Sequence, residues 1–200
     1  MAYAGYWKLR TNSTDFVGSN NGTDTAMTYS LGHAKFNGTT SKITTSYTFP
    51  NGANNKSMAL SWMSNDTNDR GWLVAGGTDN NGEAFGNFIQ DIDGCYFHGN
   101  GGAYDATISS AYPLNVWNRT VITYDGTNLR GYLNGVLAVT KAMTLNTTNG
   151  VAQTWFGGRK NSDANGWFAG KLRDIITTSA VLAAQAIKTD YMLFKGKLQC

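Results

Sequence analysis

The chain has 200 residues, of which 24 are Gly and only two are Pro, and 12% are aromatic. Its 16 basic and 13 acidic residues give a net charge of +3 and are scattered along the sequence. Nucleic-acid-binding proteins concentrate positive charge on one face, so this distribution argues against that class. No apolar run approaches the ~20 residues that a membrane span requires. The composition fits a single domain of many strands joined by tight polar turns.

The start of the chain is an alternating aromatic segment, residues 3–10, without the basic leader and apolar stretch of a secretory signal. We therefore expect synthesis in a cytoplasm without a signal peptide, unless a leader has been removed.

Short strands are predicted along most of the chain, because alternating or apolar segments are bounded by Gly, Asn and Asp. The segment 57–63 carries Met58, Leu60 and Trp62 on one face, and its expected partner across a charged loop is 71–76. Residues 87–98 predict a hairpin that turns at Asp93-Gly94. The other predicted strands are 3–10, 25–29, 34–38, 41–45, 107–113, 154–158 and 167–177.

The clearest pattern is a three-stranded meander over residues 117–137. Apolar and polar residues alternate with the period of two that a strand requires. Asp125-Gly126 and Asn134-Gly135 supply the two turns, since both pairs tolerate positive φ. Residues 183–192, with Ile187 and Tyr191 four apart, predict one short amphipathic helix. Residues 195–200 are expected to form a short basic tail after a domain of residues 1–194.

These segments and their order are similar to a known family. YWKL, NSTDFVGSNNGT, AKFNGTTSKIT, the aromatic hairpin, WNRTVITYDGTNLRGYLNG and WFAGKLRDIIT follow one another as in laminin-G-like members of the concanavalin A-like lectin/glucanase superfamily. The most specific pieces are Trp117 with its two turns, and Phe168-Ala169-Gly170 before the last strand. The resemblance implies an all-β, two-sheet antiparallel jelly-roll sandwich with a short C-terminal helix. It also implies a module for glycan binding or adhesion, of a kind frequent in bacterial, phage and other viral proteins.

Calcium is a cofactor that the resemblance suggests. Laminin-G-like domains often hold one calcium ion on oxygen ligands. Asp15 matches the family's aspartate in the first loop, and Asp174 lies where the family often has an acidic pair, although Arg173 replaces its first member. The alternative is that Asp15 caps a turn and that Asp174 pairs with Arg173 or Lys171.

A binding surface is predicted from aromatic rings near amides and loop carboxylates. Sugars lay their C–H faces on aromatic rings, and their hydroxyls need donors and acceptors. Each aromatic residue can instead pack in the core, and Tyr104 and Trp167, both in loops, are the most exposed candidates. The predicted residues are Trp72, Asn100, Tyr104, Asp105, Trp155, Asn161, Asp163 and Trp167.

Catalysis is not expected. Glucanases of the superfamily carry paired carboxylates on one strand, and Asp91-Ile92-Asp93 offers two side chains on one face. However, Asp93-Gly94 serves better as a turn, and the only Glu of the chain is Glu83, in a polar loop. His33 and His98 have no nucleophile elbow beside them in the sequence. Cys95 and Cys200 are expected to stay unpaired.

We therefore expect a non-catalytic binding or adhesion module. The favoured role is a virion-surface structural protein, such as a decoration, fibre or tail protein, exposed on a virion or a cell surface. It would bind a capsid or tail neighbour, could form a homo-oligomer, and could present its concave face to host glycans. The alternatives are a stand-alone carbohydrate-binding lectin and a glycoside hydrolase of the glucanase type.

Overall fold

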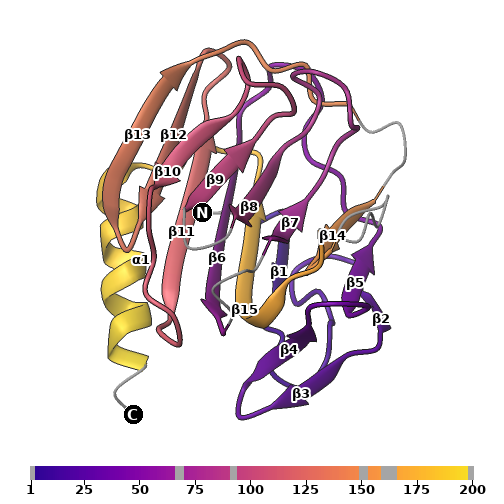
Figure 1. Ribbon diagram of the computed structural model, residues 1–200. Coiled ribbons are helices and arrows are strands. Elements are labelled where there is room, and N and C mark those ends of the chain that lie inside the picture. The colour runs from indigo at the N-terminus through magenta and orange to yellow at the C-terminus, as the bar shows by residue number, and fades with distance from the viewer. Residues whose placement is uncertain (1–2, 66–69, 91–93, 149–152, 159–165, 198–200) are drawn as a thin grey trace.

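Two antiparallel sheets packed face to face make up the computed structural model, which describes residues 3–65, 70–90, 94–148, 153–158 and 166–197 (Figure 1). The eight-stranded sheet has the order β13-β12-β11-β6-β15-β4-β3, and β1 also pairs with β15. Its strands are β1 (Gly5–Trp7), β3 (Thr28–Ser30), β4 (His33–Asn37), β6 (Lys56–Ser64), β11 (Asn118–Tyr124), β12 (Asn128–Leu133), β13 (Val136–Ala142) and β15 (Ala169–Thr178).

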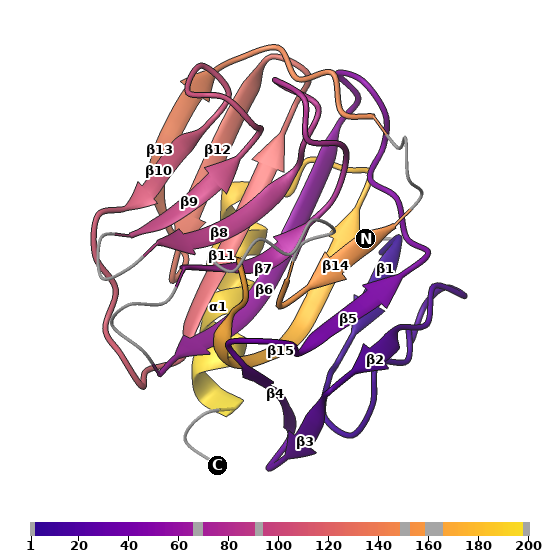
Figure 2. The same cartoon turned by 45° about the vertical axis from the view of Figure 1, so that its right-hand side comes forward.

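The seven-stranded sheet has the order β10-β9-β8-β7-β14-β5-β2. Figure 2 shows its strands crossing in front of the eight-stranded sheet. They are β2 (Thr23–Thr25), β5 (Lys42–Thr45), β7 (Arg70–Ala75), β8 (Gly86–Gln90), β9 (Cys95–His98), β10 (Ala106–Ser109) and β14 (Thr154–Phe156). The helix α1 (Ala184–Lys197) completes the fold. The predicted class, an all-β two-sheet sandwich with a C-terminal helix, is confirmed.

The main core lies between the two sheets. Met58, Leu60 and Trp62 of β6 all enter it, as the alternation predicted, and all are 0% exposed. Phe97 and Phe156 enter it from the seven-stranded sheet. Burial of such large apolar side chains stabilises the fold by about 1.5–3 kcal/mol each.

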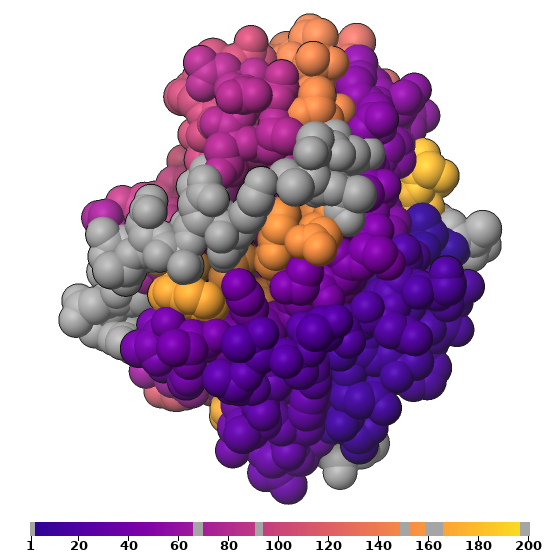
Figure 3. All heavy atoms as spheres, turned by 90° about the vertical axis from the view of Figure 1, so that its right-hand side faces the viewer, coloured from indigo at the N-terminus to yellow at the C-terminus, as the bar shows by residue number. Residues whose placement is uncertain are grey.

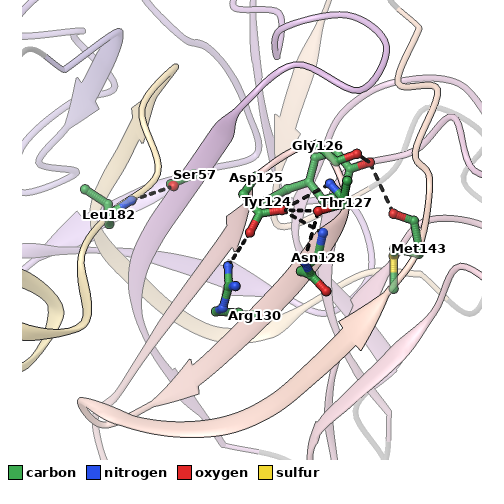
Figure 4. Close-up of polar contacts among 9 residues, drawn as sticks. All are labelled: Ser57, Tyr124, Asp125, Gly126, Thr127, Asn128, Arg130, Met143 and Leu182. Atoms are coloured by element: carbon green, nitrogen blue, oxygen red, sulfur yellow. Dashed lines mark hydrogen bonds and ion pairs between the residues drawn. The ribbon is translucent and has the colours of Figure 1, made fainter.

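The predicted meander forms β11, β12 and β13, which are neighbours in one sheet. Asn134 and Gly135 have φ of 52° and 80°, as a two-residue hairpin turn of the I′ type requires. The other turn is longer and is held by Asp125, whose Oδ1 accepts hydrogen bonds from the N–H groups of Thr127 and Asn128 (Figure 4). Its Oδ2 lies 2.6 Å from Arg130 Nη1. Burial alone would raise the pKa of Asp125, but Arg130 and the N–H donors together hold it well below its ordinary value.

The predicted pairing of residues 57–63 with 71–76 is wrong. These segments form β6 and β7, which lie in different sheets. The pairing partners of β6 are β11 and β15, from later parts of the chain. Short connections favour neighbouring strands only on average. Here β6 is a central strand whose two edges are taken by β11 and β15, so β7 pairs in the other sheet.

Several boundaries also differ from the sequence prediction. Residues 25–29, predicted as one strand, are divided between β2 and β3 in different sheets, with Ala26 at φ 48° between them. The hairpin of residues 87–98 is confirmed as β8 and β9. The helix continues to Lys197, so it includes part of the predicted basic tail.

Helix α1 covers the outer face of the eight-stranded sheet (Figures 1 and 2). Ile187, 1% exposed, packs on Ala59, Val121 and Ile176 in a second small core. Arg119, 2% exposed, donates from Nε to Asp190 Oδ2 over 2.8 Å and so fixes the helix electrostatically. Within the described residues, no helix has the length and apolar character needed to cross a membrane.

Candidate functional site

The outer face of the seven-stranded sheet carries a row of aromatic side chains. Strand alternation sends Leu73, Ile89 and Phe97 into the main core, while Trp72 and Phe88 face outward. Trp72 and Trp155 belong to a separate outer cluster, and Phe88 packs against it. The ring centroids of Trp72 and Phe88 are 5.2 Å apart. Figure 3 shows the side of the molecule where β14, in orange, reaches the surface beside earlier parts of the chain in purple.

Next to this cluster is a groove of about 460 Å³, which we call the sheet groove. Its volume falls within the roughly 300–1,000 Å³ of small-ligand sites. Two outward-facing rings form part of its wall, and amide, imidazole, carboxylate and hydroxyl groups complete it. The side chains that line it include Phe88, Gln90, Tyr96, His98, Asp105 and Thr107.

The polar edge of the sheet groove is held in place by Asp105. Its Oδ1 lies 3.2 Å from His98 Nδ1 and accepts hydrogen bonds from the backbone N–H groups of Gly99 and Asn100. Lys141 Nζ donates to the carbonyl oxygen of Asp105 over 2.6 Å. The imidazole of His98 is fixed on its other side by an edge contact with Trp72, at 4.7 Å between centroids. The groove therefore has an ordered carboxylate, with 33% of the Asp105 side chain exposed.

Of the residues predicted for the surface, Asp105 lines the sheet groove directly. Trp72 and Trp155 lie on the outer face but are only 6% and 5% exposed, so their rings support the groove rather than present a free face. Trp167 is half-buried beside Lys42, whose Nζ is 5.8 Å from its ring centroid. Asn161 and Asp163 lie outside the described residues.

Two predicted loop residues have structural contacts instead. The amide of Asn100 donates to the carbonyl oxygen of Asp79. Tyr104 was expected to be among the most exposed aromatics, but it is half-buried and packs against the main core. A Cβ added at Gly82 would lie 2.9 Å from its ring, which shows how closely the loop encloses it. Both residues shape the loop that carries Asp105.

Five of the groove residues named above were not predicted: Phe88, Gln90, Tyr96, His98 and Thr107. The first four occupy alternating positions in the predicted hairpin of residues 87–98, so the period of two could have grouped them on one face. It could not tell which face is turned to solvent. The sequence indicated only that His98 has no nucleophile elbow beside it, whereas in the structure it contacts both Asp105 and Trp72.

The sequence matches the family described as the concanavalin A-like lectin/glucanases superfamily over residues 37–188. The chain belongs to this superfamily. No curated protein sequence shows significant similarity to this concanavalin A-like domain.

Solved structures of similar fold extend the comparison. Domain 4 of AbnA, an extracellular arabinanase from Geobacillus stearothermophilus, in complex with arabinotriose, is 16% identical, with a TM-score of 0.74 over 94% of this chain and 97% of that domain. The botulinum neurotoxin serotype D ligand-binding domain, in complex with N-acetylneuraminic acid, is 16% identical, with a TM-score of 0.70 over 96% of this chain and 50% of that one. A Trypanosoma rangeli sialidase is 11% identical, with a TM-score of 0.74 over 97% of this chain and 33% of that one. Identities this low show a shared fold alone.

The carboxylates predicted to bind calcium in this concanavalin A-like domain already have other partners. Asp15, 5% exposed, accepts from the N–H groups of Tyr6 and Val17 at Oδ1 and from the backbone and side-chain N–H groups of Asn20 at Oδ2. Burial acts to raise the pKa of Asp15, but these donors together lower it below its ordinary value. This is the arrangement of a carboxylate that caps a turn.

Asp174 has cationic neighbours rather than further oxygen ligands. Its Oδ2 lies 3.9 Å from both Arg10 Nη2 and Arg173 Nε, and its Oδ1 accepts from the Tyr6 hydroxyl over 3.1 Å. Guanidinium groups at this distance oppose a divalent cation. Among the described residues, no three His, Cys, Asp or Glu side chains gather as metal ligands. The donor set around these two carboxylates does not fit calcium, and calcium binding itself stays a prediction.

The acidic residues considered for catalysis fall into two groups. Asp91 and Asp93 lie outside the described residues. Glu83 Oε2 accepts hydrogen bonds from Thr78, Asn80 and Thr148, and these bonds lower the pKa of Glu83 below its ordinary value. A carboxylate with a lowered pKa is a poor general acid, so Glu83 is suited to holding two loops together.

Proposed function

We propose that this protein is a non-catalytic carbohydrate-binding module and that the sheet groove is its binding site. The observation that carries the proposal is the combination of two outward rings, Phe88 and Tyr96, with the ordered carboxylate of Asp105 at one edge. A sugar ring would place its C–H face on the rings and direct its hydroxyls to Gln90 and Asp105. The fold shared with domains solved with arabinotriose and N-acetylneuraminic acid supports this reading.

Fixed side chains favour such binding. Asp105 is already held by two backbone N–H groups and His98, so a ligand does not have to order it. Pre-ordered polar groups lose little conformational entropy when a ligand binds, which raises affinity for a small ligand. The sheet groove is therefore suited to selective binding of one or two sugar rings.

The test is isothermal titration calorimetry with an oligosaccharide chosen from a glycan array. Tyr96→Ala should weaken binding about tenfold or more, since removal of an aromatic contact at the centre of a site typically costs more than 1 kcal/mol. Leu31→Ala removes an apolar side chain that is 94% exposed between β3 and β4, outside the sheet groove, and should leave affinity unchanged. Equal affinities for the wild type and Tyr96→Ala, or release of reducing sugar by the protein, would contradict the proposal.

The finer part of the proposal is display on a virion or cell surface, with a capsid or tail neighbour or a second copy as protein partner. Its support is strand β13, which lies at the end of the strand order and exposes Val136 and Leu137 by 68% and 51%. Exposed apolar edge strands are places where another chain can pair. Light scattering coupled to size exclusion, before and after Leu137→Lys, tests this role. A monomer that fails to co-purify with particles would contradict it.

A further inference from the structure

A second groove lies on the outer face of the eight-stranded sheet, between β1, β15 and the C-terminal half of α1. Its volume is about 760 Å³, and we call it the basic groove. Three cationic side chains line it together with one tyrosine and two apolar residues of the helix. They are Lys8, Arg10, Arg173, Tyr6, Met192 and Leu193. It is lined by none of the residues of the sheet groove, so the inference below does not depend on the proposed function.

Burial of neighbouring residues places two of the cations on this face. Trp7, at the end of β1, and Leu9, beyond it at φ 53°, enter the main core. Tyr6, Lys8 and Arg10 line the basic groove on the other side of the sheet. The direction is fixed by packing, because Trp7 and Leu9 are 0% exposed. Lys8 and Arg10 are thus held on the outer face by the burial of their neighbours.

A bulge in β15 supplies the third cation. Leu172 and Ile175 both enter the core, and the register with β6 shifts between Arg173 and Ile176. Arg173 and Asp174, which lie between the core residues Leu172 and Ile175, therefore share the outer face, and Asp174 has φ 50°. Asp174 N–H donates to the Lys8 carbonyl oxygen over 3.2 Å, which ties the bulge to the segment that carries the other cations.

The basic groove keeps an excess of positive charge. Among the described residues, one carboxylate faces these three cations: Asp174, which is 3.9 Å from Arg10 and from Arg173 and also accepts from Tyr6. Nearby Arg119 has its own counter-charge in Asp190. Burial, and then repulsion from Arg10 and Arg119, lower the pKa of Arg173 despite the attraction of Asp174. An anion in the basic groove would relieve this repulsion.

Arg173 is oriented for anion recognition. The carbon at the centre of its guanidinium lies 4.4 Å from the Trp117 ring centroid and 5.4 Å from that of Phe194, so two aromatic rings restrain it. Its Nε and Nη2 make no hydrogen bond within the described part of the chain, apart from the long ion pair with Asp174. Buried N–H donors without acceptors are costly. The two oxygens of a carboxylate or sulfate match the guanidinium fork.

Apolar groups next to the cations indicate what carries the anion. Met192 and Leu193 are 60% and 64% exposed at the groove, and Phe16, 53% exposed, lies under Lys8 with 4.0 Å between Nζ and the ring centroid. Large apolar side chains exposed together mark an interaction site. The volume of about 760 Å³ falls within the roughly 300–1,000 Å³ of small-ligand sites.

We propose that the basic groove binds an acidic saccharide, with its carboxylate or sulfate held by Arg173 and Arg10 and its ring against Tyr6 and the helix. The site lies on the opposite sheet from the sheet groove, so one chain can contact a glycan at two places. An acidic peptide and an inorganic anion share the charge of this ligand but lack the sugar ring.

The test follows tryptophan fluorescence, since Trp117 contacts Arg173, during titration with glucose 6-sulfate and with glucuronate. Arg10→Gln should weaken binding about fivefold and Arg173→Gln about tenfold, the range expected when charge-assisted hydrogen bonds to a ligand are lost. Arg10 is 47% exposed, so its variant should fold normally even if Arg173→Gln does not. Lys35→Gln, which removes an exposed charge from β4 of the same sheet, is the matched control and should leave affinity unchanged.

Four results would overturn the proposal. The first is that neutral glucose binds as tightly as glucose 6-sulfate. The second is that sodium sulfate or tetraglutamate binds as tightly as glucose 6-sulfate. The third is that Arg10→Gln leaves the affinity for glucose 6-sulfate unchanged. The fourth is loss of acidic-sugar binding in Tyr96→Ala, because that result would locate the ligand in the sheet groove. If Tyr96→Ala does not weaken binding of a neutral oligosaccharide, the proposed function of the sheet groove fails, but the proposal for the basic groove is not affected.

Discussion

Lys56 is a buried cation, and its effect on stability should depend strongly on pH. It begins β6 and is 0% exposed. Its Nζ donates to the Gly52 carbonyl oxygen over 2.8 Å and to Thr147 Oγ1 over 3.0 Å, and it lies 5.7 Å and 5.4 Å from the rings of Phe85 and Tyr124. Among the described residues, no carboxylate forms an ion pair with it. Burial lowers the pKa of Lys56 from 10.5 to about 8.

The direction of the effect follows from proton binding. Below pH 8 both the folded and the unfolded chain carry the charge, and the folded state bears the full cost of burying it. Between pH 8 and 10.5 the unfolded chain keeps its proton while the folded chain loses it, so stability rises with pH. The difference between the two pKa values corresponds to about 3 kcal/mol.

The variant Lys56→Met isolates this contribution, because all other titrating groups are common to both proteins. Urea unfolding followed by tryptophan fluorescence, repeated between pH 7 and pH 11, gives the free energy of unfolding of each. We expect the wild-type value minus the Lys56→Met value to rise by about 3 kcal/mol over this range. A difference that stays constant within about 0.5 kcal/mol would show that the ammonium keeps its ordinary pKa and would refute the reasoning.

Three further predictions concern the helix, a turn and calcium. Asp190→Asn removes the counter-charge of buried Arg119, and urea unfolding should show a free energy of unfolding lower by about 2 kcal/mol. The loss is smaller than for a fully buried pair because Asp190 is 39% exposed. An unchanged free energy of unfolding would contradict this prediction. Gly135→Ala should lower the free energy of unfolding by about 2 kcal/mol, because the residue has φ 80° and the new Cβ would lie 3.0 Å from Tyr191. The control Gly32→Ala, at φ 78° with open space around it, should lower it by about 1 kcal/mol. Equal losses would show that α1 does not press on the turn. EDTA should shift the melting temperature by less than about 1 °C, because N–H donors already satisfy the Asp15 carboxylate. A rise of several degrees in the melting temperature with millimolar calcium would show instead that calcium binds.

The local signals in the sequence predicted the strands well. The Asn134-Gly135 turn has the positive φ values that its residue types favour, and β11 to β13 are neighbours in one sheet. The period of two placed Met58, Leu60 and Trp62 on one face, which is the buried face of β6. These features depend on residues close in sequence, so their residue types are sufficient to specify them.

The candidate site was predicted only in part. Asp105 and the neighbouring Trp72 were identified from residue type, but their burial was not, because the covering of an outward face depends on distant segments. Tyr96 and His98 were missed because alternation separates the two faces of a strand without assigning either to solvent.

What the sequence by itself determined is most of the strands and their turns, since hydrophobic period and turn chemistry are local properties, while the superfamily was indicated by the resemblance of its motifs and their order. Only the tertiary structure decided that β6 pairs with β11 and β15, that a bulge turns Arg173 and Asp174 to one face, and that Lys56 and Arg119 are buried. These features bring together residues more than 50 positions apart, and such contacts form only when the whole chain closes its loops and covers its core.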